Sequence, residues 1–285
     1  MNKMDYQLID SGFGEKLERF GEYTIVRPCS QAIWSKSKEL SKAWSDCNAS
    51  FNRRQGHHWE GRDAIPESWI VQLETIKMKL KITNFGHVGL FPETLNLWKN
   101  IKEKITAAKA KQKRNFQFLN LFAYSGGATM AASQAGAHCC HVDASKGMVQ
   151  WAKENAQINQ IAKNPIRWIV DDVNKFLKRE IRRGKRYDGI LLDPPSFGRG
   201  KSGELYKIEN AMIETLENVG KVLNHEFSFI YLTSHTPGFT PTVLSNLLKK
   251  LFNNGSITSG EMLLKAVEGG GLDIPNGSWS CIDNI

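Results

Sequence analysis

Acidic residues and glycines gather in five short loops, each of which follows a run of apolar residues. The loops read Ala123-Tyr124-Ser125-Gly126-Gly127, Asp143-Ala144-Ser145, Asp171-Asp172-Val173, Asp193-Pro194-Pro195-Ser196-Phe197 and Thr233-Ser234-His235. A carboxylate accepts hydrogen bonds from hydroxyl and amino groups, and a glycine pair lets the backbone approach a ligand because no Cβ intervenes. These loops therefore carry the residue types that bind a polar small molecule.

Three of the acidic residues suit a ligand that contains adenosine. Asp143 can accept hydrogen bonds from both ribose hydroxyls, and Asp172 can accept one from the amino group of adenine. Val173 offers an apolar contact to the adenine ring. We favour Asp172 over Asp171 for this role because the aliphatic residue follows Asp172 directly.

The first loop does not match a dinucleotide site. Dinucleotide sites use the pattern G-x-G-x-x-G, which places the pyrophosphate at a helix N-terminus. Residues 123–129 read A-Y-S-G-G-A-T instead. This difference disfavours a nicotinamide dehydrogenase and favours an adenosine cofactor without phosphate groups, of which S-adenosylmethionine is the natural candidate.

The apolar runs before the loops predict the strands that position them. These runs cover residues 116–122, 138–143, 166–171, 187–193 and 227–233. Helical patterns separate the runs, and such alternation is typical of a doubly wound α/β fold with a parallel sheet between two layers of helices. Ligands of such a sheet bind beyond the carboxyl ends of its strands, which is where the five loops lie.

The intervening segments predict helices, and the last part of the chain predicts two more strands. Ser145 can cap a helix that ends near residue 159. Apolar residues recur at helical spacing over 205–223 and 243–252, and late strands are expected over 260–267 and 278–282. Residues 1–80 instead hold short strand-like runs among Trp, Arg and His. We therefore predict a small β-rich or irregular module over 1–80 and an α/β domain over 81–285.

Four segments resemble the class I S-adenosylmethionine-dependent methyltransferases, specifically the bacterial group related to large-subunit ribosomal RNA methyltransferases. The segments are FLNLFAYSGGATM, VDASKGMVQWAKENAQIN, IVDDVNKFL and YDGILLDPPSFGRG, and the resemblance covers roughly residues 85–235. It implies a mostly parallel, seven-stranded, Rossmann-like sheet. It also implies S-adenosyl-L-methionine as the cofactor and RNA, ribosomal or otherwise structured, as the partner.

The resemblance also implies roles for individual residues. The methionine end of the cofactor is expected against Asn120, Phe122, Ala123, Tyr124 and Gly126. The ribose is expected at Asp143, Ala144 and Ser145, and the adenine at Asp172 and Val173. The catalytic residues are expected to be Asp193, Pro194, Pro195 and Phe197, with Asp193 also touching the cofactor. Residues 87–93, which read H-V-G-L-F-P-E, stand where the family has a segment that closes over the cofactor.

The D-P-P motif suits methyl transfer to an exocyclic amine. Transfer from a sulfonium is an in-line displacement, so the protein mainly holds the nucleophile close and in line. The Asp193 carboxylate and a backbone carbonyl of the rigid Pro-Pro turn can accept from the amine and direct its lone pair at the methyl group. With Phe197 stacked on the base, N-methylation of guanine is the favoured reaction.

Methylation of cytosine at C5 is not expected. That reaction needs a Cys thiolate as nucleophile, which the related enzymes carry in the D-P-P loop or after the fifth strand. This chain has no cysteine at 194–196 or 233–236. The five cysteines are Cys29, Cys47, Cys139, Cys140 and Cys281. Their odd number and the absence of a C-x-x-C pair predict free thiols in a reducing compartment and no metal site.

The net charge of +9 makes a polyanionic partner worth testing. Residues 99–114 and 175–186 each contain seven Lys or Arg residues and one Glu, and together they exceed the net charge. Each run directly precedes a strand, at the end of the sheet opposite the cofactor, and we interpret both as solvated helix ends. Better candidates for steering RNA are Arg199, Lys201, Arg53, Arg54, His57, His58 and Arg62.

Other interpretations stay open at this stage. The acceptor of the methyl group could be a protein amide or a small molecule, and the chain could be a cofactor-binding RNA module without turnover, although the intact D-P-P motif argues against the latter. His235 could accept a proton or be a hydrogen-bonded structural residue. The first 20 residues lack an apolar signal region, and no later stretch approaches about 18 apolar residues. We therefore expect a cytoplasmic protein without a membrane segment.

Overall fold

The chain forms two compact units in the structure, a computed structural model that describes residues 4–52, 56, 58–111, 114–199 and 205–284. The first unit comprises Met1–Leu95 and Leu263–Asn276, and the second comprises Asn96–Met262 and Gly277–Ile285. The predicted boundary near residue 80 did not anticipate the late segment of the first unit. That segment joins because Val267 N donates to Leu8 O at 3.0 Å and Gly271 N donates to Ile9 O at 3.0 Å.

The first unit is built from a five-stranded sheet and a hairpin, which confirms the predicted β-rich module. The sheet order is β1-β2-β3-β4-β5, with β1 Tyr6–Gly12, β2 Glu15–Phe20, β3 Tyr23–Pro28, β4 Ala49–Asn52 and β5 His58–Glu60. The hairpin pairs β6 Trp69–Leu73 with β7 Ile76–Leu80, and the short helical elements are α1 Ser41–Ser45, η1 Arg62–Ala64 and η2 Pro92–Thr94. Glu18, which is fully buried, is neutralised by Arg27 through hydrogen bonds of 2.8 and 2.9 Å.

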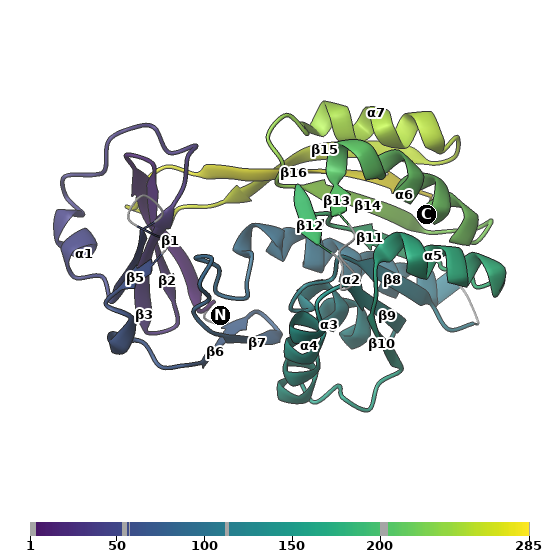
Figure 1. The fold of residues 1–285 in the computed structure, drawn as a ribbon, viewed down its shortest axis with the longest axis horizontal. Helices are drawn as coiled ribbons and strands as arrows, with labels where there is room; N and C mark the ends of the chain where they lie inside the picture. Colours follow the sequence, from purple (N-terminus) through teal and green to yellow (C-terminus); the bar gives the residue numbers. More distant parts are fainter. Residues whose placement is uncertain (1–3, 53–55, 57, 112–113, 200–204, 285) are drawn as a thin grey trace. The chain divides into compact units, whose positions relative to one another are not determined.

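The second unit contains the predicted seven-stranded, mostly parallel sheet (Figure 1). Its order is β10-β9-β8-β11-β14-β16-β15, with β8 Gln117–Leu121, β9 His138–Asp143, β10 Ile166–Val170, β11 Gly189–Leu192, β14 Phe229–Ser234, β15 Ser256–Leu264 and β16 Ile274–Asp283. Strand β16 runs antiparallel to β14, and the other paired strands from β10 to β14 are parallel. The order reverses between β8 and β11, so ligand loops are expected beyond the carboxyl ends of these two strands.

Helices cover both faces of this sheet. They are α2 Leu95–Lys111, α3 Gly127–Gln134, α4 Lys146–Ile158, α5 Val173–Arg182, α6 Ile208–Val222 and α7 Pro241–Leu251. Leu119 and Leu121 of β8 pack with the apolar residues of α5, α6 and α7 in one core cluster. Asn120 faces the opposite way, toward Thr129 of α3. This alternation along one strand shows that the sheet is buried on both sides.

Caps in the sequence fix the starts of three helices. Ser145, as predicted, accepts a hydrogen bond from Met148 N at 3.4 Å at the start of α4. Asp172 caps α5 and Thr240 caps α7 in the same way. The helix predicted from residue 205 instead begins at Ile208, because Leu205 pairs with Arg199 in a small hairpin of β12 Phe197–Arg199 and β13 Leu205–Lys207. Among the described residues, no helix combines the length and apolar character that crossing a bilayer requires.

Candidate functional site

The parallel register brings the predicted loops to one edge of the sheet. Leu121 at the end of β8 lies beside Val142 of β9 and Leu192 of β11, and Leu192 lies beside Leu232 of β14. Val170 at the end of β10 pairs with Asp143. The five loops that follow these strands are therefore neighbours, as the sequence predicted.

The loop after β8 has an unusual backbone. Phe122 and Tyr124 have φ angles of 56° and 49°, and Gly126 has a φ of 89°. Left-handed conformations at residues with a Cβ cost on the order of 1–3 kcal/mol each and persist only where surrounding contacts impose them. Here Ala123 N donates to Val142 O at 3.0 Å, and Tyr124 N donates to Asp143 Oδ2 at 2.9 Å. The strained segment is thus tied to β9, directly beside the predicted ribose carboxylate.

The glycine pair of this loop has two different roles. Gly126 adopts the left-handed conformation that turns the chain into α3. Gly127 is required by packing, since a Cβ there would lie 1.9 Å from Cζ2 of Trp98. The second glycine therefore allows α2 and α3 to approach, whereas the first shapes the loop.

Asp143 is oriented by two neutral donors. Its Oδ1 accepts from Ser145 N at 2.8 Å, and its Oδ2 accepts from Tyr124 N at 2.9 Å. Burial raises the pKa of the Asp143 carboxyl, and the two backbone hydrogen bonds oppose this shift without cancelling it. Each oxygen keeps a second lone pair, so the carboxylate can accept from two vicinal hydroxyls. This geometry fits a ribose.

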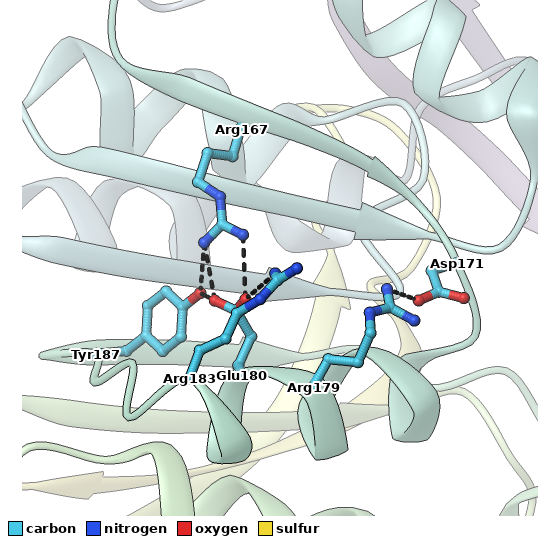
Figure 2. Close-up of polar contacts among 6 residues, drawn as sticks. All are labelled: Arg167, Asp171, Arg179, Glu180, Arg183 and Tyr187. Atoms are coloured by element: carbon cyan, nitrogen blue, oxygen red, sulfur yellow. Dashed lines mark hydrogen bonds and ion pairs between the residues drawn. The ribbon is translucent and has the colours of Figure 1, made fainter.

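The two acids after β10 differ in their contacts. Asp171 forms an ion pair with Arg179 of α5 (Figure 2). Asp172 uses Oδ1 to accept from Lys175 N at 2.9 Å as the cap of α5. Val173 lies in the core and is only 3% exposed, so it offers a ligand very little surface. Asp171 is thus paired with an arginine, whereas Asp172 accepts from a backbone N–H, and the choice of Asp172 for the adenine stays a prediction.

Asn120 lies beneath the loop rather than on it. Its side chain is buried, and Nδ2 donates to Thr129 Oγ1 at 2.9 Å. The same hydroxyl lies 3.0 Å from His141 Nδ1, and burial lowers the pKa of His141 to about 3. The structure therefore places the Asn120 side chain in a neutral buried network with Thr129 and His141.

The D-P-P turn is fastened to the loop after β14. Asp193 Oδ1 accepts from Thr233 Oγ1 at 2.6 Å and lies 3.7 Å from His235 Nδ1. Ser196 Oγ and Thr236 Oγ1 are 2.7 Å apart. Burial raises the pKa of the Asp193 carboxyl, but the contact with His235 and the Thr233 hydroxyl outweigh this effect, and the pKa lies below its usual value. An ionised acceptor thus stands at the end of β11.

Thr233 and Thr236 were not among the predicted site residues. Their only signal in the sequence is the pattern T-S-H-T directly after a buried strand, and the contact of Thr233 with Asp193 spans 40 residues. The structure also settles where His235 lies, beside Asp193 with its side chain 31% exposed. Pro194 is buried within the turn, whereas Pro195 is exposed.

Phe197 begins the small hairpin that follows the D-P-P turn. Its side chain is 51% exposed. Tyr206 on the other hairpin strand is buried, and its ring meets that of Phe122 edge-on with centroids 5.0 Å apart. The hairpin therefore rests on the strained loop after β8. Lys201, Arg53, Arg54 and His57 lie outside the described residues, as does the side chain of Arg199.

The cysteines lie away from these loops. All five are free, with Cys139 and Cys140 inside β9 and Cys281 inside β16. Burial raises the pKa of the Cys140 thiol to about 12, so it stays protonated at neutral pH. In the part of the chain that the structure describes, no group of three or more His, Cys, Asp or Glu side chains could hold a metal ion.

The segment proposed to close over the cofactor belongs to the first unit. Glu93, its last residue, is buried, and its Oε1 accepts from Asn276 Nδ2 at 2.5 Å within that unit. His87 packs edge-on against Phe91, with ring centroids 5.3 Å apart. These contacts hold residues 87–93 within the first unit. That this segment closes over the cofactor stays a prediction.

Comparisons with known proteins agree with this geometry. The family described as conserved hypothetical protein 95 matches residues 97–260. The chain is 34% identical to the crystal structure of the SAM dependent methyltransferase from Agrobacterium tumefaciens, with a TM-score of 0.91 and coverage of 99% of this chain and 91% of that one.

Two curated bacterial proteins are similar over a large part of the chain. Ribosomal RNA large subunit methyltransferase K of Neisseria meningitidis serogroup B is 29% identical over 203 residues, which are 70% of this chain and 54% of the relative. Ribosomal RNA large subunit methyltransferase K/L of Pseudoalteromonas translucida is 32% identical over 214 residues, which are 74% of this chain and 29% of the relative. The chain thus spans about half, or less, of the length of these relatives.

Proposed function

Because this chain belongs to the family described as conserved hypothetical protein 95, we propose that it is an S-adenosylmethionine-dependent methyltransferase that N-methylates a base of structured RNA. Guanine in ribosomal RNA is the preferred target. The curated relatives are named as large-subunit ribosomal RNA methyltransferases, and the similar solved structure is named as a SAM-dependent methyltransferase. The sequence-based expectation of a cytoplasmic protein fits such a substrate.

The residues at the carboxyl edge fit S-adenosylmethionine. Asp143 offers two oriented carboxylate oxygens to the ribose hydroxyls, and Asp172 offers an acceptor to the adenine amino group. The bent backbone at Phe122, Ala123 and Tyr124, with Gly126 behind it, would hold the methionine end. Ala144 and Ser145 follow Asp143 and border the ribose. When bound, this cofactor supplies an electrophilic methyl group on a sulfonium.

Asp193 would hold the acceptor amine. Its carboxylate is kept ionised and in place by Thr233 and His235, so it can accept an N–H of the amine and fix the direction of the nitrogen lone pair. The Pro194-Pro195 turn restricts the backbone around it, and its carbonyl offers a second acceptor. Phe197, half exposed beside the turn, would stack on the base. The chain thereby aligns the nucleophile, which is what an in-line displacement requires.

One observation carries the proposal: two carboxylates stand at the ends of β9 and β11 on the same edge of the sheet, Asp143 oriented by two backbone N–H groups and Asp193 by the Thr233 hydroxyl and His235. Such donors orient a carboxylate and leave its charge available to a ligand. The absence of cysteine from 194–196 and 233–236 argues against methylation of cytosine at C5, which needs a thiolate.

The test compares nucleosides of ribosomal RNA from cells with and without the gene by mass spectrometry. We expect one N-methylated guanosine to be lost from the deletion strain and restored by the wild-type gene, but not by the Asp193→Asn variant. Loss of 5-methylcytidine instead would contradict the proposed chemistry. Transfer of labelled methyl groups from purified enzyme into protease-sensitive rather than ribonuclease-sensitive material would favour a protein amide as the acceptor.

A further inference from the structure

The carboxyl-terminal end of α5 and the turn after it carry a dense group of cations. Arg182, Arg183, Lys185 and Arg186 are all exposed there. Arg167 of the edge strand β10 reaches the same place, because its guanidinium bonds to Glu180 of α5. We name these five residues the α5 cationic surface.

The single acid of this segment is hidden from solvent. Glu180 has no exposed side-chain surface. Its carboxylate accepts from Arg167 at 2.8 and 3.1 Å, from the Tyr187 hydroxyl at 2.6 Å and from Arg183 at 3.2 Å (Figure 2). Burial raises the pKa of Glu180, but these donors outweigh it and lower the pKa to about 2. The carboxylate is therefore fully charged and fully occupied at neutral pH.

This arrangement orders two guanidinium groups around one carboxylate and leaves a net charge of +1. One carboxylate is shared by Arg167 and Arg183, whose side chains remain 44% and 59% exposed. An exposed arginine normally loses rotamer freedom when it binds an anion, and a guanidinium that is already held loses less. Each fork also keeps N–H donors that Glu180 does not use. The result is a prearranged pair of donors for an anion.

The helix dipole alone does not account for this surface. A helix C-terminus favours one or two cations in its last turn, each by about 0.3–1 kcal/mol. Here four exposed cations lie at or just after the end of α5, more than the helix dipole favours, and they repel one another. A solvated helix end also does not account for Arg167, which comes from β10 and bonds to the buried Glu180. A polyanion that binds across the group would remove the repulsion.

We infer that the α5 cationic surface binds the phosphate backbone of the RNA substrate, away from the base that is methylated. This inference rests on the proposed function for the identity of the polyanion. Asp172 caps α5 at the carboxyl edge of the sheet, and the ten residues of the helix place its cationic end about 15 Å from that edge. A structured RNA spans such a distance, so the surface would anchor the RNA helix while its target base enters the D-P-P site.

The test measures RNA binding against salt for three full-length proteins. They are the wild type, a triple variant with Arg182→Gln, Lys185→Gln and Arg186→Gln, and a control with Lys221→Gln, Lys249→Gln and Lys250→Gln. The control removes three exposed lysines from the last turns of α6 and α7, which end without a comparable cluster. The probe is deproteinised ribosomal RNA from cells that lack the gene. Among the described residues, the donors to Glu180 are Arg167, Arg183 and Tyr187, none of which is substituted in these variants. Arg186 donates to the backbone carbonyl of Lys185.

We expect the triple variant to bind RNA more weakly and to lose about one unit of the slope of log K against log salt for each phosphate contact removed, up to about three in total. The control should keep the wild-type slope, and calorimetric affinity for S-adenosylmethionine should be unchanged in both. Adding Arg183→Gln to the triple variant should lower the slope further.

Three outcomes would overturn the inference. They are a wild-type slope in the triple variant, an equal loss in the control, and displacement of RNA by polyglutamate at equal charge concentration. Because this readout is binding, it is independent of turnover. An RNA that binds through this surface but is never methylated would defeat the proposed function alone, and methylated RNA with an unchanged slope would defeat the inference alone.

Discussion

The two edges of the seven-stranded sheet hold their carboxylates in opposite ways. At the carboxyl edge, Asp143 and Asp193 are partly exposed; Asp143 receives two backbone N–H groups, and Asp193 receives the Thr233 hydroxyl and lies 3.7 Å from His235. At the amino edge, Asp188 and Glu180 have no exposed side-chain surface and receive guanidinium groups from Arg114, Arg167 and Arg183. Neutral donors fix the direction of a carboxylate and leave its charge for a ligand. Guanidinium donors match the charge and make the carboxylate part of the framework.

One acid at the carboxyl edge follows the pattern of the amino edge. Asp171 is paired with Arg179, although it lies next to Asp172 at the end of β10. By the same reasoning Asp171 belongs to the framework, and Asp172 remains the residue that we propose for the site. The kind of donor therefore distinguishes Asp171 from Asp172, whereas the sequence distinguished them only by Val173, which follows Asp172.

The largest expected effect concerns Asp193. Asp193→Asn keeps the shape of the side chain and removes the charge that holds the acceptor amine, so turnover should fall about 10²- to 10³-fold. The thermal midpoint should change little, because the asparagine amide oxygen can still accept from Thr233. Methyl transfer at saturating cofactor measures the first effect, and calorimetry measures the second. If Asp193→Asn instead lowered the thermal midpoint and kept the turnover per folded molecule, Asp193 would be a structural residue like Asp188.

The matching change at the amino edge, Asp188→Asn, should lower stability and leave turnover nearly unchanged. Asp188 accepts from Arg114, from Gln117 N at 2.8 Å and from Asn224 Nδ2 at 2.5 Å. Asp188→Asn should lower the free energy of unfolding by about 3 kcal/mol, since hydrogen bonds to a charged group contribute about 1.5–3 kcal/mol each and are not additive. Turnover per folded molecule should stay within about twofold of the wild type. Urea unfolding with parallel activity measurements would check both values.

Asp143 should give an intermediate result that is confined to the cofactor. Asp143→Asn weakens the acceptor for two hydroxyls, so affinity for S-adenosylmethionine should fall about 10- to 100-fold. The variant should keep its RNA affinity, because Asp143 lies at the end of β9 beside Tyr124 and not on the α5 cationic surface. Calorimetric titration with the cofactor and RNA binding in its absence would separate the two. Unchanged cofactor affinity would remove Asp143 from the site.

The sequence predicted the strands and the strand-end loops because both signals are local. The parallel strands other than the edge strand β10 are largely buried runs, and the acids and the glycine pair lie at or just after strand ends. The Ser145 cap is local in the same sense. The hairpin after D-P-P was wrongly joined to the next helix, because Leu205 continues the helical spacing of that helix and strands of three residues leave little periodic signal.

Other features depend on contacts between distant residues. Thr233 meets Asp193 across 40 residues, and Ala266 bridges Leu8 across most of the chain. The buried position of Asn120 follows from the pairing of α3 with β8 and β9, which a strand pattern alone does not reveal. The same holds for the α5 cationic surface, since the sequence shows its charges but not the sharing of Glu180 by two arginines.

The smallest expected effect is a pH dependence at the amino edge. The pKa of Glu180 is lowered from its usual 4.5 to about 2. A carboxyl with a lower pKa in the folded state stabilises the protein above the unfolded-state pKa and loses that contribution as pH falls through the folded-state pKa. The contribution of Glu180 should therefore be complete above about pH 4.5 and disappear toward pH 2.

Comparison with Glu180→Gln isolates this contribution. The wild type should exceed the variant in unfolding free energy by about 1–2 kcal/mol at pH 6, a modest value because Arg167 and Arg183 are partly exposed and screened. The difference should shrink between pH 4.5 and 2. The buried His141 titrates identically in both proteins, so its effect cancels. Glu214→Gln, which removes an exposed pair with Lys178, should change stability by less than about 1 kcal/mol. A difference that stays constant down to pH 2 would mean that Glu180 does not act through its charge, and the contrast between the two edges would then rest on Asp188 alone.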